Sequence, residues 1–150
     1  MRKKKITNSD CKKAPMDKSY ITSVLKKGSS NLRTSDILGS LTFLRKNNIE
    51  VESLLGCGSL GATMLAHKIS NALEPEPSIA VKLVYVESEE DLAVYIEQLS
   101  KISMLKSPNT ANMIGVLSNI DNNCLFILSE YFPNGNLITY FKANRDLNET

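Results

Sequence analysis

The chain has 150 residues, of which 42% are hydrophobic and 23% are charged. This size favours one domain with its own hydrophobic core, and we do not expect several domains within these residues. No apolar run approaches the roughly 18 residues that span a membrane. The lysine-rich N-terminus lacks the apolar segment of a secretory signal, so we expect a cytoplasmic location for the chain as written.

The cysteine and histidine content argues against a metal site. Cys11, Cys57 and Cys124 are widely spaced and form no Cys-x-x-Cys pair, and the single histidine is His67. Structural zinc sites combine four such ligands at short spacings. We therefore expect free thiols and no bound metal.

The first third of the chain is basic. Residues 1–50 carry 12 Lys or Arg against four Asp or Glu, whereas residues 51–150 carry six against 12. Residues 1–45 show no sustained helical or strand period, which predicts a flexible arm with at most a short turn of helix at Ser35–Leu44. Such an arm is either a solvated linker or a segment near an anionic membrane surface. Nucleic-acid binding is not expected, because aromatic residues do not alternate with the basic ones.

Residues 46–150 are expected to form one α+β unit that begins with strands. Apolar and polar residues alternate at 49–54, which predicts a strand with one solvated face, and the β-branched run at 79–86 predicts another. Between them come three closely spaced glycines, an apolar segment at 62–68, and a surface turn that contains two prolines.

The second half of this unit alternates helices and strands. Acidic residues predict a helix start near residue 87, and its expected apolar face consists of Leu92, Tyr95 or Ile96, Leu99, Ile102 and Leu105. Strands are expected at 112–120 and 124–130. A final helix at 134–146 would be capped by Asn134 or Asn136 and carry an apolar stripe of Leu137, Tyr140 and Phe141.

The segment Gly56–Gly61 has the spacing Gly-x-Gly-x-x-Gly, which occurs in both dinucleotide-binding and phosphate-binding loops. A dinucleotide-binding fold needs an almost wholly apolar first strand, but Glu50 and Glu52 give this strand a solvated side. It also needs an acidic residue about twenty positions on, and Glu87 lies 26 positions past Gly61. We therefore favour an antiparallel hairpin over phosphates and keep an NAD(P)-binding oxidoreductase as a minor alternative.

Lys82 lies in the middle of the strand expected at 79–86. A lysine among β-branched neighbours is costly to bury. We expect its ammonium group to reach the same phosphates as the glycine-rich turn, and the alternative is a lysine that faces solvent.

Four motifs in order resemble the small lobe of a protein kinase. They are Gly56–Thr63, Ala80–Lys82, Ser107–Asn109 and Ser129–Leu137. Over about residues 45–144 the chain is most similar to receptor tyrosine kinases of the platelet-derived growth factor and stem cell factor receptor type. The resemblance implies a five-stranded antiparallel sheet with one main helix, followed by a hinge and the first helix of a large lobe, and it implies ATP as the ligand.

The resemblance also implies roles for single residues. Leu55, Thr63 and Ala80 would enclose the adenine, Lys82 would pair with the α- and β-phosphates, and Ser129 falls at the gatekeeper position. Glu130 to Phe132 would be the hinge. The complete set of implied ATP-binding residues is Leu55, Gly56, Cys57, Gly58, Ser59, Leu60, Gly61, Thr63, Ala80, Lys82, Ser129, Glu130, Tyr131 and Phe132.

The chain departs from the family pattern in two respects. The glutamate that should hold the lysine is replaced by Gln98, with Glu97 beside it, and helical periodicity from Ile102 favours Gln98 as the inward residue. The catalytic and magnesium-binding aspartates of the family have no counterpart in these residues, so no catalytic set is complete and Mg²⁺ is expected only with a large lobe.

We therefore expect the ATP-binding small lobe of a tyrosine-kinase-like domain that is not catalytic alone. In a longer receptor tyrosine kinase it would lie on the cytoplasmic side of a membrane. The alternative is a pseudokinase-like interaction module that docks on a full-length kinase through the helix that carries Gln98 and through an exposed lower face around Leu137 and Tyr140.

Overall fold

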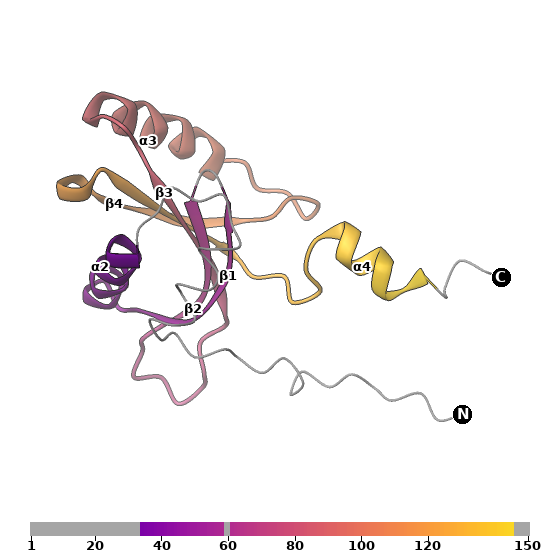
Figure 1. Ribbon diagram of the computed structural model, residues 1–150. Helices are drawn as coiled ribbons and strands as arrows, with labels where there is room; N and C mark the ends of the chain where they lie inside the picture. The colour runs from indigo at the N-terminus through magenta and orange to yellow at the C-terminus, as the bar shows by residue number, and fades with distance from the viewer. Residues whose placement is uncertain (1–33, 59–60, 146–150) are drawn as a thin grey trace.

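A five-stranded antiparallel sheet forms the centre of the fold, in the order β1-β2-β3-β5-β4 (Figure 1). The computed structural model describes residues 34–58 and 61–145. The strands are β1 Ile49–Gly58, β2 Gly61–Lys68, β3 Ile79–Tyr85, β4 Met113–Asn119 and β5 Cys124–Glu130. The helices are α2 Thr34–Lys46, α3 Glu89–Ser103 and α4 Leu137–Ala143, with a 3-10 turn at Ile120–Asn122. The expected α+β fold with five antiparallel strands is confirmed.

The first two strands form a hairpin whose tip is the glycine-rich segment. β1 pairs antiparallel with β2, and Gly58 lies opposite Gly61. A dinucleotide-binding fold would instead place a helix between two parallel strands. The oxidoreductase alternative is therefore wrong.

The two faces of the sheet differ in what covers them. Along β3, Val81 and Leu83 are fully buried on one side, which we call the outer face, while Lys82 is exposed on the other. We call the second side the α3 face, because α3 packs against part of it. Figure 1 shows α2 and α3 on opposite sides of the sheet. The period of two in a strand thus separates the core from the solvated lysine.

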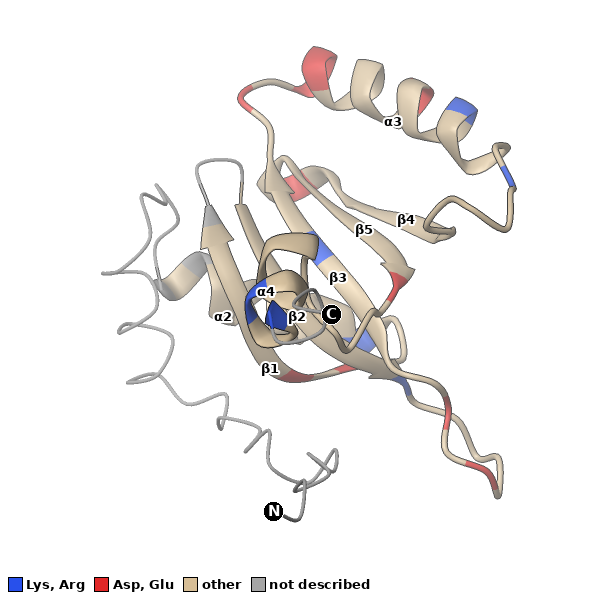
Figure 2. Ribbon diagram, turned by 90° about the vertical axis from the view of Figure 1, so that its right-hand side faces the viewer, with Lys and Arg blue, Asp and Glu red and all other residues tan. Residues whose placement is uncertain are grey.

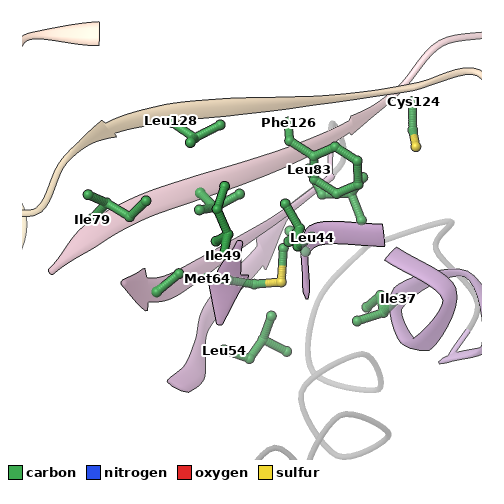
Figure 3. Close-up of a cluster of buried hydrophobic side chains, with 13 residues drawn as sticks. Ile37, Leu44, Ile49, Leu54, Met64, Ile79, Leu83, Cys124, Phe126 and Leu128 are labelled. Carbon is green, nitrogen blue, oxygen red and sulfur yellow. The ribbon is translucent and has the colours of Figure 1, made fainter. Parts of the chain in front are cut away.

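Helix α2 covers the outer face. Ile37 and Leu44 are fully buried and point from α2 towards side chains of the strands, among them Met64 and Phe126 (Figure 3). The ring of Phe43 stacks on that of Phe126, with centroids 5.1 Å apart and an interplanar angle of 14°. This helix is therefore part of the core of the sheet.

The expectation of a flexible arm through residue 45 is wrong for residues 34–45, where the short turn of helix allowed at Ser35–Leu44 is a helix of 13 residues. Residues 1–33 lie outside the described part of the chain. Ile37, Leu41 and Leu44 have helical spacing over only two turns, and the buried polar Ser40 shares their face. So short a stripe gives little periodic signal. The apolar outer face of the sheet, which the local pattern cannot show, decides that this segment folds.

Helix α3 begins as the sequence indicates. Ser88 accepts a hydrogen bond at its Oγ from the backbone N–H of Asp91, at 3.1 Å, and the acidic residues of the first turn lie at the helix N-terminus (Figure 2), where the helix dipole favours negative charge. The helix packs through Leu92, Ile96 and Leu99.

The other end of the apolar face of α3 was predicted incorrectly. Ile102 is 49% exposed and Leu105 is 68% exposed. The row of Leu92, Ile96 and Leu99 continues at Ser103, which follows from 3.6 residues per turn.

None of the described helices is long and apolar enough to cross a bilayer.

We expect Leu44→Ala to lower the free energy of unfolding by about 2–5 kcal/mol, because it leaves a cavity in the outer core. Thr42→Ala, on the exposed side of the same helix, should change it by less than about 0.5 kcal/mol. Urea denaturation of both variants measures the difference. Equal, small effects would contradict the packing of α2.

Candidate nucleotide-binding site

The register of the strands places the expected site residues on one face. Thr63 lies opposite Lys82, and Lys82 lies opposite Ile127, so the three side chains form one row on the α3 face. In the next row Ala80 lies opposite Ser129. The structure therefore brings Thr63, Ala80, Lys82 and Ser129 together, as a shared ligand would require.

The glycine hairpin is the tip of β1 and β2 and adjoins the Lys82 row. A shift in register between Leu54 and Gly56 leaves Leu55 as the extra residue, with 47% of it exposed. Gly56 lies opposite Thr63, and the space that a Cβ would take at Gly56 is open. A ligand can therefore approach the backbone there without meeting a side chain of this residue. Ser59 and Leu60 lie outside the described residues.

Gly61 has a different role, because it lies directly against β3. Its φ is +147°, and an added Cβ would stand 1.8 Å from the carbonyl oxygen of Leu83. No other residue fits without moving the backbone. Packing alone therefore explains this glycine, and the sequence motif by itself does not reveal which glycines serve a ligand.

Cys57 faces away from the other site residues. It lies opposite Ala62, which is buried, and its side chain packs against the outer core. Burial raises the pKa of the Cys57 thiol. The Cys57 side chain is therefore not on the face of Thr63 and Lys82, and at that face Cys57 offers only its backbone.

Among the described residues, Lys82 forms no ion pair with a residue of α3. Glu97 instead forms an ion pair with Lys101 at 2.8 Å, and the two side chains are 69% and 73% exposed, so the pair contributes little. Gln98 is exposed as well. Within residues 34–58 and 61–145, no ion pair joins Lys82 to another described residue. Ile102, from which helical periodicity favours an inward Gln98, is itself half exposed.

The expected hinge follows β5 directly. Glu130 donates its N–H to the carbonyl of Asn112 at 3.1 Å and accepts the N–H of Asn112 at its Oε2 at 2.9 Å. These two bonds hold the end of β5 against the segment before β4. Tyr131 is half-buried, and Phe132 is 56% exposed.

The helix after the hinge begins at a clear cap. Asn136 accepts a hydrogen bond at its Oδ1 from the N–H of Thr139 at 2.8 Å, which identifies Asn136 and not Asn134 as the N-cap. Figure 1 shows α4 apart from the sheet. Its apolar side chains are 42% to 68% exposed: Leu137, Ile138, Tyr140 and Phe141.

One polar cluster of the β1–β2 hairpin has no role in the sequence interpretation. His67 lies with its Nδ1 3.0 Å from Glu52 Oε1 and its Nε2 3.7 Å from Glu50 Oε2. The cluster joins β1 to β2 at the end of the hairpin remote from the glycines. The alternation of Glu50 and Glu52 was the available signal, because it placed both on the solvated side.

The comparisons with known proteins agree with this arrangement. The sequence model of the protein tyrosine and serine/threonine kinase family matches residues 49–150. The chain belongs to this family. It is also 30% identical over 105 residues to the fibroblast growth factor receptor homolog 2 of Drosophila melanogaster, an alignment that covers 67% of the chain and 10% of that relative. The chain thus spans about a tenth of the relative's length.

Members of the family use ATP and Mg²⁺. The described residues are better suited to bind ATP than to bind the metal ion. Gly56, Lys82 and the face they share provide an open backbone and a cation for phosphates. Within the described part of the chain, no group of three or more His, Cys, Asp or Glu is placed to hold a metal ion.

We expect Gly61→Ala to lower the free energy of unfolding by about 2–3 kcal/mol, because the added methyl group collides with β3. Gly56→Ala should change it by less than about 0.5 kcal/mol, since its Cβ would stand in open space. Thermal unfolding of the two variants provides the comparison. A Gly61→Ala variant as stable as Gly56→Ala would show that the close contact with Leu83 is not formed.

Proposed function

We propose that this chain is the ATP-binding small lobe of a tyrosine-kinase-like protein kinase domain. The observation that supports this most is the row of Thr63, Lys82 and Ile127, which adjoins the glycine hairpin where Thr63 lies opposite Gly56. It places one exposed ammonium group next to an open stretch of backbone. Membership of the kinase family and the similarity to a receptor homolog point to the same function.

In this proposal the backbone N–H groups of the hairpin and the Lys82 ammonium bind the phosphates. Lys82 is exposed, so its ammonium group keeps much of its hydration until the nucleotide replaces the bound water. Leu55, Thr63 and Ala80 contact the adenine. The backbone of Glu130 to Phe132 binds the edge of the base beside Ser129.

The chain by itself is proposed to bind nucleotide without transferring phosphate. Phosphoryl transfer needs a base and a metal site in addition to the lysine. Binding is expected to be weak, because one side of a kinase cleft encloses little of the ligand's surface. A receptor of the platelet-derived growth factor or stem cell factor receptor type, with this lobe on the cytoplasmic side of a membrane, is the finer form of the proposal.

Lys82→Ala should weaken ATP binding about tenfold, because a charge-assisted contact with the phosphates is lost. The matched control is Lys68→Ala, which removes the same charge from the far end of β2, where Lys68 is exposed. Amide NMR shifts during titration with metal-free ATP measure the dissociation constants. The proposal fails if the unaltered chain shows no shift, or if Lys82→Ala binds as well as Lys68→Ala.

A second candidate function rests on the exposed apolar side chains of α4. Leu137, Ile138 and Phe141 are each more than half exposed, and exposed apolar clusters of this kind mark protein contacts. In this alternative the chain is a pseudokinase-like module that docks on a full-length kinase through α4.

The docking alternative predicts that a full-length kinase co-purifies with the chain and is lost when Leu137→Asp is combined with Tyr140→Asp. Two charges on the contact surface would oppose burial. Ala143→Asp, at the end of the same helix, is the control and should retain the partner. Retention by the double variant would refute docking through α4.

A further inference from the structure

Helix α2 precedes the family match, which begins at residue 49, yet its side chains belong to the core of the sheet. Ile37 and Leu44 have no exposed surface. Phe43 is only half-buried, but its ring lies flat on Phe126 at 5.1 Å. The kinase-like sheet of this chain is therefore built with a helix that the family pattern does not include.

Phe126 lies on the strand that borders the candidate site. It is opposite Leu83 of β3 on the outer face, and the next residue, Ile127, is opposite Lys82 on the α3 face. A single peptide unit thus separates the ring under α2 from the row that contains Lys82. β5 then ends at Glu130, where the expected hinge begins.

The other end of α2 is joined firmly to β1. Asn47 and Asn48 make the whole connection, and their N–H groups donate to the carbonyls of Leu44 and Arg45 at 2.9 and 3.1 Å. Asn47 also donates from its Nδ2 to the carbonyl of Phe43 at 2.9 Å. Asn48 accepts the N–H of Ile69 at 2.8 Å. The helix is therefore linked to the hairpin through backbone bonds and to β5 through the aromatic stack.

We propose that Phe43 is a positioning residue for the nucleotide site, which rests on the ATP-binding function proposed above. Its ring fixes β5, with Ile127 and the hinge, relative to the glycine hairpin that β1 carries. The nucleotide lies between these two parts, so a change in their separation alters its contacts on both sides. Phe43 itself acts from the opposite face of the sheet and does not touch the ligand.

The test compares two substitutions of Phe43 in the full chain. Phe43→Tyr keeps the stacked ring and should bind ATP within twofold of the unaltered chain. Phe43→Leu keeps an apolar side chain but loses the stack, and its dissociation constant for metal-free ATP should rise about three- to tenfold. NMR titration of the folded chain measures both.

A variant that only restores stability separates positioning from folding. Gly39 is helical and a Cβ there meets nothing within 4 Å, so Gly39→Ala should stabilise α2. Added to Phe43→Leu, it should raise the unfolding temperature without recovering the affinity. Recovery of the affinity, or a Phe43→Leu variant that binds ATP like the unaltered chain, would overturn the proposal.

Amide hydrogen exchange gives a second readout that needs no ligand. In Phe43→Leu, exchange should accelerate at residues 127–132 and stay unchanged in α3, which packs on the other face. A uniform acceleration would mean a general loss of stability and would overturn the positioning role. If the unaltered chain shows no Lys82-dependent ATP shift, the proposed function itself fails, which is a different result from normal binding by Phe43→Leu.

Discussion

The alternation of side chains along β3 is the constraint on which the rest of the structure depends. Val81 and Leu83 enter the outer core and have no exposed surface, whereas Lys82 between them is exposed on the other face. Neighbouring strands repeat this division through their register. One face can therefore be filled with apolar side chains while the other keeps the Lys82 ammonium group exposed.

The same division explains why the glycine hairpin combines two kinds of position. Gly61 lies against the backbone of β3 and has no space for a Cβ, while Gly56 faces open space. Cys57 between them points to the core. The hairpin is thus held in place by packing on one side of its backbone and stays accessible on the other, which is what a phosphate-binding loop needs.

The two helices that flank the sheet make unequal contributions to the site. α3 covers part of the face that carries Lys82, through Leu92, Ile96 and Leu99, but its acidic residue Glu97 pairs with Lys101. α2 covers the opposite face and contacts the strand that leads to the hinge. In this chain the helix on the outer face is more closely connected to the strands of the site than the sequence pattern suggested.

The grouping of Thr63, Ala80, Lys82 and Ser129 came from the resemblance to protein kinases. The sequence by itself determined the five strands, the acidic start of α3 and a cap for α4 at one of two asparagines. These features follow from local periodicity, capping chemistry and motifs. Only the tertiary structure decided that α2 is a core helix, that Cys57 faces the core and that Ile102 is half exposed. Each of these depends on which surface a side chain meets across the fold, and a local pattern contains no information about that surface.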